Sequence, residues 1–391
     1  MTVLITATAL LIAYLVFEYL RHQRNVSRIP IRIHVNGTRG KSSVTRLIAA
    51  GLRAGGIKTL AKTTGTIPRV VLPDGRECSI VRLFSPNIIE QKYVFRYAAS
   101  VKPQAIVVEC MAVNPIFQWV TERKFVRSTH GVITNVRPDH QDLMGSTVHS
   151  VAMSISNTIP KNAACFTAEE KLFPILKHVA DHRETEIYKI KHDHIMDEEL
   201  QPFHYIEHSD NLALALAVCE NLGVDKETAL KGMYEASPDP GALRKYSIKE
   251  KGKCVSFYNV FAANDPESSL YIWKKINMSL SDEQRMIMLN TRADRLPRSH
   301  QLIDLFCDQH YDYFILTGEK SEHLKHYALD DRIHKDKLVV LGEIEPSEIY
   351  RNIIELSRGE SHVIGIGNIA GSKNYGAQIV HYFRNKAKGG F

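Results

Sequence analysis

Residues 31–43 of the chain read IRIHVNGTRGKSS. An apolar run typical of a buried strand leads into a glycine-containing turn, and Gly40-Lys41-Ser42 closes the turn and opens a helix-like segment. Backbone N–H groups in such a turn, together with the N-terminus of the helix, bind phosphate oxygens. Lys41 can reach the terminal phosphates of a nucleotide, and the Ser42 hydroxyl can bind Mg²⁺. The stretch therefore predicts a site for a nucleoside triphosphate.

The motif is a shortened form of the usual phosphate loop. The usual pattern has a glycine five residues before the second glycine, and this chain has Val35 there. The residues that follow support the prediction, because four apolar side chains recur at the spacing of a helix packed on a sheet: Val44, Leu47, Ile48 and Leu52. The alternative is a plain strand–turn–helix with a lysine on the surface.

Composition indicates an ordinary globular protein of two or three domains. The chain has 391 residues, of which 44% are hydrophobic and 24% charged. The formal net charge is +7 without a long basic block, so we expect no nucleic-acid partner. None of the six cysteines forms a Cys-x-x-Cys pair, which argues against a zinc site or a disulfide framework and favours a reducing compartment.

The N-terminus differs from the rest of the chain. Residues 2–20 carry one charge, Glu18, and approach the ~20 apolar residues that cross a bilayer. Arg21, Arg24 and Arg28 follow, and such a basic flank lies on the cytoplasmic side. The sequence lacks the basic start and small-residue cleavage site of a signal peptide. We therefore predict a single-pass anchor in the cell membrane over 1–20, a basic linker over 21–29 and a cytoplasmic body; the alternative is a buried or interfacial amphipathic helix.

Strand-like and helix-like segments alternate along the body, which is the pattern of an α/β fold with a mainly parallel sheet. A proline- and glycine-rich segment at 237–241 suggests a domain boundary. Expected strands before the boundary are 31–35, 105–109, 131–135 and 163–167. Expected strands after it are 254–259, 286–290, 313–316, 338–341 and 362–366.

Polar residues end or follow three of these strands. The first, 31–35, leads to the phosphate loop with Ser42. Ligands of open parallel sheets bind beyond the carboxyl ends of the strands. The strand at 105–109 ends in Glu109, and the strand at 131–135 leads to His140. Both side chains could therefore face the same Mg²⁺ as Ser42, with phosphate oxygens completing the shell. The alternatives are a solvated strand end for Glu109 and a surface loop for His140.

These residues together resemble the Mur ligase and folylpolyglutamate synthase superfamily. Its ATPase motifs are similar to GTRGKS at 37–42, Glu109, and TN at 134–135 followed by DH at 139–140 and Asp142. Its adenine-side, domain-junction and C-terminal motifs are similar to HSDN at 208–211, PGALR at 240–244 and NVFAANDP at 259–266.

Within the superfamily, the chain most resembles the catalytic subunits of bacterial poly-γ-glutamate synthases, the CapB/PgsB type. The similar segments are KTTGT at 62–66, ECMAVNP at 109–115, PDPGA at 238–242, FAAND at 261–265 and RADR at 292–295. An N-terminal anchor directly ahead of the phosphate loop also fits this type. The resemblance extends over essentially the whole chain.

The resemblance implies the fold and the site. It implies a Mur-ligase-like ATPase domain over 30–241, a smaller Rossmann-like α/β domain over 242–391, and ATP and Mg²⁺ as cofactors. The implied nucleotide-binding residues are Gly37, Thr38, Arg39, Gly40, Lys41, Ser42, Ser43, Asn211, Asn259 and Asn264. The implied metal-binding residues are Ser42, Thr66, Glu109 and His140, and the implied catalytic residues are Lys41, His140 and Arg244.

The resemblance also implies an ATP-dependent acid–amino-acid ligase. Such an enzyme polymerises glutamate through γ-carboxyl linkages by way of an acyl phosphate, for a capsule or a secreted polymer. The implied partners are glutamate, the growing poly-γ-glutamate chain and small membrane subunits. Two alternatives are another Mur- or folylpolyglutamate-type amide ligase and a non-ligase ATPase subunit of a polymer-export complex.

Two positions depart from the superfamily's pattern. Many Mur ligases carry a carbamylated lysine about 15 residues after the His140 position, and residues 151–159 contain no lysine. Asn259 stands where the superfamily usually has aspartate, so this side chain can act there through hydrogen bonds but without charge.

Overall fold

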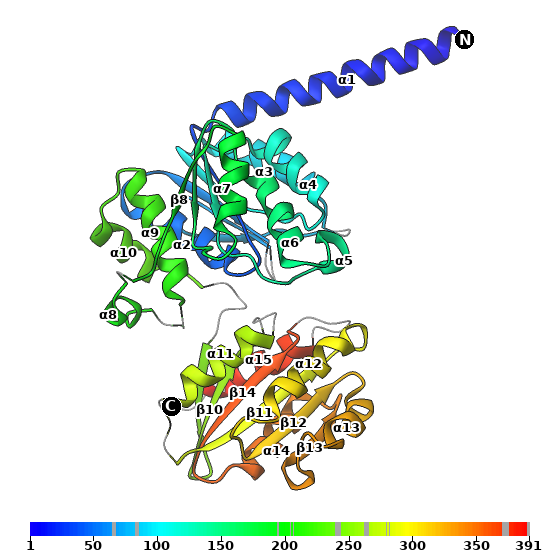
Figure 1. Cartoon of the computed structure of the whole chain (residues 1–391), viewed down its shortest axis with the longest axis vertical. Coiled ribbons are helices and arrows are strands. Elements are labelled where there is room, and N and C mark those ends of the chain that lie inside the picture. The colour runs from blue at the N-terminus through cyan, green and yellow to red at the C-terminus, as the bar shows by residue number, and fades with distance from the viewer. Residues whose placement is uncertain are drawn as a thin grey trace. The chain divides into compact units, whose positions relative to one another are not determined.

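The computed structural model describes residues 1–64, 68–82, 86–193, 195–203, 205, 207–238, 244–261, 266–278, 280, 282–369 and 375–388. The chain divides into two compact units, Met1–Asp239 and Pro240–Phe391, here called the N-terminal and C-terminal units. Each unit is built on its own sheet with helices on both faces (Figure 1).

In the described residues, the N-terminal unit has one eight-stranded sheet in the order β4-β3-β2-β5-β1-β6-β7-β8. Neighbouring strands from β2 to β8 are parallel, and β3 and β4 form an antiparallel edge. Because β1 lies between β5 and β6, the carboxyl ends of three predicted strands meet in the middle of one edge. The strands are β1 Ile31–Asn36, β2 Thr59–Thr63, β3 Arg69–Val71, β4 Glu77–Ser79, β5 Ala105–Glu109, β6 His130–Ile133, β7 Ala164–Thr167 and β8 Glu186–Lys189. The helices are α1 Thr2–Ser27, α2 Lys41–Ala54, α3 Glu90–Val101, α4 Pro115–Val120, the π-helix η1 Thr121–Val126, α5 Gln141–Met144, α6 Val148–Ile155, η2 Ser156–Thr158, α7 Phe173–His182, α8 Asp197–Leu200, α9 Ser209–Asn221 and α10 Lys226–Tyr234.

The C-terminal unit has a six-stranded sheet among its described residues, in the order β13-β12-β11-β14-β10-β9. All neighbouring strands are parallel except β9, which pairs antiparallel with β10 at the edge. The strands are β9 Arg244–Glu250, β10 Lys253–Asn259, β11 Gln284–Thr291, β12 Tyr313–Gly318, β13 Leu338–Gly342 and β14 Glu360–Gly367. The helices are α11 Pro266–Asn277, η3 Ala293–Arg295, α12 Leu296–Phe306, α13 Ser321–Leu329, η4 Lys335–Lys337, α14 Pro346–Leu356 and α15 Tyr375–Lys388. The predicted α/β class with mainly parallel sheets is confirmed.

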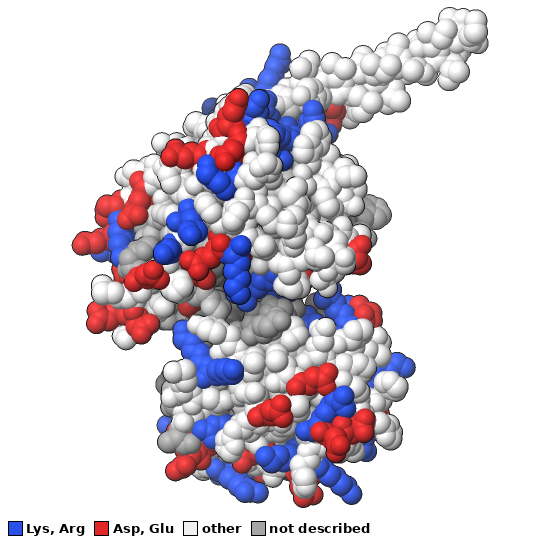
Figure 2. Space-filling model, in the orientation of Figure 1, with Lys and Arg blue, Asp and Glu red and all other residues white. Residues whose placement is uncertain are grey.

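Helix α1 is long and apolar enough to cross a membrane, and its apolar part projects from the N-terminal unit (Figure 2). The helix continues to Ser27, so the basic linker predicted over 21–29 is helical for most of its length. The physical reason is that no proline or glycine interrupts residues 21–27, and His22 and Val26, one turn apart, are both buried against the unit.

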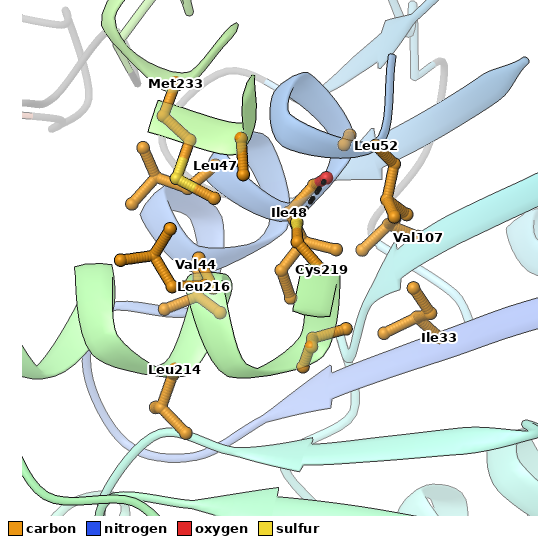
Figure 3. Packing of buried hydrophobic residues seen from close by; sticks show 14 of the residues in the cluster. Ile33, Val44, Leu47, Ile48, Leu52, Val107, Leu214, Leu216, Cys219 and Met233 are labelled. Atoms are coloured by element: carbon orange, nitrogen blue, oxygen red, sulfur yellow. Dashed lines mark hydrogen bonds between the residues drawn. The ribbon is translucent and has the colours of Figure 1, made fainter. Parts of the chain in front are cut away.

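The core of the N-terminal unit packs α2 between the sheet and helices α9 and α10 (Figure 3). The four side chains that predicted the amphipathic helix, Val44, Leu47, Ile48 and Leu52, are all 0% exposed. Cys219 of α9 packs against this helix, and its Sγ lies 3.8 Å from the Ile48 carbonyl oxygen. Full burial of α2 fixes the position of its N-terminus, where the phosphate loop ends.

A buried ion pair on the other face of the sheet makes stability depend on pH. His34 Nδ1 lies 2.8 Å from Glu122 Oε2, and Ser128 donates two further hydrogen bonds to the same carboxylate. Burial disfavours the imidazolium, but Cys110 and Glu122 favour it more strongly and raise the pKa of His34 to about 9. Breaking such a pair leaves an uncompensated buried charge.

We therefore expect the N-terminal unit to lose stability in alkaline solution. A histidine pKa raised from 6.5 to about 9 contributes stability that is complete below pH 6.5 and is lost as the pH rises through 9. The loss amounts to about 3 kcal/mol. Hydrogen exchange of the β1 amides at pH 6.5 and 9.5 measures it for this unit alone. Glu122→Gln should flatten the dependence, and an unchanged profile in that variant would contradict the assignment.

Candidate active site

The phosphate loop joins β1 to α2 and has the backbone that its two glycines permit. Gly37 and Gly40 have φ angles of +130° and +80°. A Cβ atom at Gly37 would overlap Thr134 Oγ1, and one at Gly40 would overlap Asn211 Oδ1. The loop is thus held tightly from two sides, and only glycine fits at both positions.

The loop after β6 fixes the shape of the phosphate loop by hydrogen bonds. The Thr38 amide donates to the Asn135 carbonyl (3.0 Å), and the Arg39 amide donates to Asn135 Oδ1 (3.1 Å). Thr134 Oγ1 donates to the Arg39 carbonyl at 2.5 Å. A loop restrained at both faces keeps its remaining N–H groups oriented for an anion, as phosphate binding requires.

Lys41 folds back over this loop. Its Nζ donates to the carbonyls of Gly37 and Thr38 at 2.7 and 3.2 Å. Burial lowers the pKa of Lys41, although the neighbouring Glu109 opposes that shift. The ammonium therefore lies at the mouth of the loop, where phosphates of a nucleotide would replace the two carbonyls as its partners.

The structure brings Ser42 and Glu109 together, as the strand order predicts. Ser42 Oγ donates to Glu109 Oε2 at 2.8 Å, and the Thr64 amide donates to the same oxygen at 2.6 Å. Glu109 ends β5 and is 3% exposed. A carboxylate and a hydroxyl side by side at the helix N-terminus are the oxygen donors that Mg²⁺ takes together with nucleotide phosphates.

His140 is not joined to this pair. No hydrogen bond or ion pair connects its described side chain to Ser42 or Glu109; Nε2 lies 3.9 Å from Asp139 Oδ1, and the side chain is 43% exposed. Its backbone is left-handed, with φ of 43°, and directly precedes α5. Asp139 instead pairs with Arg39 of the phosphate loop, Oδ2 to Nη1 at 3.3 Å. The loop after β6 thus contacts the phosphate loop through Asp139. The metal role of His140 stays a prediction.

Asn211 reaches the phosphate loop from α9, and it depends on a residue that the sequence did not reveal. Glu207 is 3% exposed and accepts hydrogen bonds from Asn211 Nδ2 (2.7 Å) and the His208 amide (2.9 Å). Burial raises the pKa of Glu207, and these hydrogen bonds oppose the shift. The only sequence signal is a carboxylate one residue before the HSDN segment.

Two predicted residues meet in the C-terminal unit. Arg244 and Asn259 stand directly opposite each other in the antiparallel pairing of β9 and β10. Side chains at such positions are close neighbours. Asn259 is 1% exposed, and its Oδ1 has no hydrogen-bond partner among the described residues. Thr66 and Asn264 lie outside the described residues, as do residues 240–243 of the PGALR segment.

The residues present in the N-terminal unit fit ATP and Mg²⁺. The phosphate loop has the tight backbone that glycine alone permits at positions 37 and 40, and Lys41, Ser42 and Glu109 supply the cation and the oxygen donors beside it. No group of three or more His, Cys, Asp or Glu side chains in the described part of the chain could hold a metal without help. A metal here would therefore need phosphate or water oxygens, which is the usual way in which Mg²⁺ is bound.

The architecture places the chain in a known class. Residues 35–237 match the Mur ligase middle domain, and residues 245–386 match the poly-gamma-glutamate synthase CapB C-terminal domain. The fold is shared with folylpolyglutamate synthase of Mycobacterium tuberculosis complexed with ADP, at a TM-score of 0.70 and 16% identity over 94% of this chain and 93% of that one. The fold is also shared with the bifunctional folylpolyglutamate synthase/dihydrofolate synthase of Yersinia pestis, complexed with AMPPNP and Mn ion. The TM-score is 0.70, and the identity is 13% over 93% of this chain and 91% of that one. The protein thus has the Mur ligase and folylpolyglutamate synthase fold.

Two relatives narrow the class. PGA synthase CapB of Bacillus subtilis (strain 168) is 37% identical over 393 residues, which cover 99% of both chains. Capsule biosynthesis protein CapB of Bacillus anthracis is 41% identical over 297 residues, which cover 75% of this chain and 64% of that protein. The chain belongs to the CapB family of poly-γ-glutamate synthases, and the resemblance drawn from the sequence is confirmed.

Proposed function

We propose that the protein is an ATP-dependent ligase that joins glutamate residues through their γ-carboxyl groups. The observation that carries the proposal is the Lys41, Ser42 and Glu109 arrangement at a tight phosphate loop, in a chain 37% identical to a PGA synthase over its whole length. A carboxylate is a poor acyl donor, so amide formation needs activation. The γ-phosphoryl group of ATP passes to the terminal γ-carboxylate, leaving ADP. The amine of the next glutamate then attacks the acyl phosphate, phosphate leaves, and the nitrogen loses a proton.

The residues of the chain position the reactants and neutralise charge, which is most of what phosphoryl transfer requires. The loop amides and Lys41 hold the phosphates of ATP. Mg²⁺, held by Ser42 and Glu109, would neutralise charge on the phosphates. Arg244 presents a planar fork that suits a carboxylate of the acidic chain, and Asn259 offers a neutral acceptor beside it. These residue roles are part of the proposal.

The proposal extends to location and partners. Helix α1 would span the cell membrane once with the catalytic body in the cytoplasm, since Arg21, Arg24 and Arg28 follow the apolar run. A polymer made at the membrane surface also suits small membrane subunits as partners in synthesis and export.

Isotope transfer tests the chemistry directly. The full-length protein is incubated with ATP, Mg²⁺ and a γ-linked glutamate dimer carrying ¹⁸O in its terminal γ-carboxyl group, with L- or D-glutamate as acceptor. We expect ADP formation that requires the acceptor, a γ-linked product, and one ¹⁸O atom in each phosphate released, because the activated oxygen leaves with phosphorus. ATP hydrolysis that ignores glutamate and yields unlabelled phosphate would instead indicate a non-ligase ATPase subunit.

A further inference from the structure

Helix α1 is fastened to the N-terminal unit at the point where its apolar run ends. Glu18 Oε2 lies 2.6 Å from Lys92 Nζ, and Glu18 Oε1 lies 3.4 Å from Arg96 Nη2. One turn later His22 is 4% exposed between the rings of Phe95 and Phe125. These contacts leave no flexible hinge between the apolar run and the unit. The elements beside Glu18 are therefore fixed at the level where α1 would leave the hydrocarbon.

Helix α3, which pairs with Glu18, exposes apolar side chains on its outer side. Ile89, Tyr93 and Tyr97 are 45%, 60% and 44% exposed and recur every four residues, which places them in one stripe. Val94, Phe95 and Ala98 of the same helix are buried in the core. The stripe thus faces away from the unit, beside the two basic residues that hold Glu18.

Helix α4, like α3, exposes apolar side chains. Ile116, Phe117 and Trp119 are 68%, 52% and 41% exposed. The helix continues into η1, which contacts both α1 and α3, so α3 and α4 lie near the base of the projecting helix (Figure 1). We call the six residues Ile89, Tyr93, Tyr97, Ile116, Phe117 and Trp119 the interface face.

Cations accompany the aromatic rings of this face. The Arg96 guanidinium lies 5.5 Å from the Tyr93 ring centroid, and Lys124 Nζ lies 5.9 Å from that of Trp119. Lys and Arg side chains also gather around the base of α1 (Figure 2). Tyrosine and tryptophan rings beside basic groups are typical of the boundary between hydrocarbon and lipid headgroups. Anionic headgroups would complement the basic groups.

We propose that the interface face lies in the headgroup layer of the bilayer that α1 spans, so that the N-terminal unit is held against the membrane in one orientation. The inference rests on the proposed membrane location of α1. Lipid is the occupant because the ion pairs of Glu18 fix α3 at the height of the headgroups. A protein subunit at the same face is the competing outcome.

Trp119 provides the test, because the chain has two tryptophans and the other, Trp273, is 1% exposed in the C-terminal unit. Full-length wild type and Trp119→Phe are reconstituted into phosphatidylcholine–phosphatidylglycerol vesicles, with and without lipid brominated near the headgroup end of its chains. The difference between the two proteins isolates Trp119. We expect brominated lipid to lower the Trp119 emission roughly two-fold, as for a ring at the membrane boundary. The emission of Trp119→Phe should not change.

Insertion and catalysis are measured on the same samples. One outcome would overturn the interface face and leave the anchor and the ligase activity standing. In it, the protein resists alkaline extraction and forms ADP with glutamate, but brominated lipid does not change the Trp119 emission. If Trp119 in native membranes is then shielded from aqueous iodide, the face contacts a protein. A protein that is extracted by alkali yet remains an active ligase overturns both the interface face and the anchor, while the proposed chemistry stands.

Discussion

Replacing Lys41 by alanine is expected to abolish glutamate-dependent ATP turnover and to leave the protein folded. Among the described residues, the hydrogen bonds of the Nζ atom go to carbonyls of the phosphate loop, at 2.7 and 3.2 Å, and none reaches a distant part of the unit. The contacts that hold α2 come from residues 44–52, which remain. Removing one preorganised charge from a phosphoryl-transfer site lowers the rate by about 10²–10³-fold or more. ADP formation measures the rate, and circular dichroism measures folding.

Lys58→Ala is the matched control for this experiment. Lys58 is exposed and donates to the Val101 carbonyl at 2.8 Å. It precedes β2, at the amino edge of the parallel strands, whereas the phosphate loop follows the carboxyl edge. The control loses the same charge and should keep wild-type turnover. If Lys41→Ala, correctly folded, turned over ATP as fast as this control, the loop would not be the phosphate site.

The strands that carry the site were predictable from sequence because they are buried on both faces. The run at 105–109 is apolar up to Glu109, and the run at 31–35 alternates three apolar residues with Arg32 and His34; both form strands, β5 and β1. Strands β1 and β5 are parallel neighbours, so their carboxyl ends lie side by side. Glu109 is the last residue of β5 and Ser42 follows the end of β1, and this pairing therefore brings the two residues together. The contact is thus a consequence of topology, and the sequence pattern was enough to anticipate it.

Other elements escaped prediction because distant residues stabilise them. Strand β2 contains Lys62, which is fully buried and pairs with Glu90 of α3 at 2.8 Å. A lysine in a five-residue segment does not signal a buried strand until its partner is known. The end of α1 is a similar case, since His22 and Gln23 reach carbonyls of η1 that lie about a hundred positions away. Polar residues that satisfy distant backbone groups look like a linker in the sequence.

The position of His140 depends on backbone conformation that sequence does not specify. Its left-handed φ of 43° belongs to a residue type that adopts this region only occasionally. The sequence placed His140 after the correct strand and predicted that it faces the same Mg²⁺ as Ser42. In the structure the described side chain of His140 makes no hydrogen bond or ion pair with Ser42 or Glu109. Glu207 was missed for the opposite reason: its role follows from its burial beside Asn211, and no spacing rule points to it.

Glu109→Gln is expected to weaken Mg²⁺ binding strongly while preserving the loop. The glutamine oxygen can still accept the hydrogen bonds from Ser42 and the Thr64 amide, which now reach Glu109 Oε2 at 2.8 and 2.6 Å. What the substitution removes is the negative charge. Loss of a metal ligand or of its hydrogen-bonded support typically costs about 10–100-fold in metal affinity or activity. The Mg²⁺ concentration that gives half-maximal ADP formation should rise by that factor.

Glu169→Gln separates this effect from the loss of any buried carboxylate. Glu169 is 8% exposed and accepts hydrogen bonds from the amides of Val136 and Leu172 at 2.8 and 3.1 Å, beyond the end of β7. Its variant should titrate with Mg²⁺ like the wild type. If Glu109→Gln also did so, Glu109 would only tether Ser42 and Thr64, and the metal would have to take its protein oxygens from elsewhere. A shift confined to Glu109→Gln would mean that the charge of this carboxylate, rather than its hydrogen bonds, serves the metal.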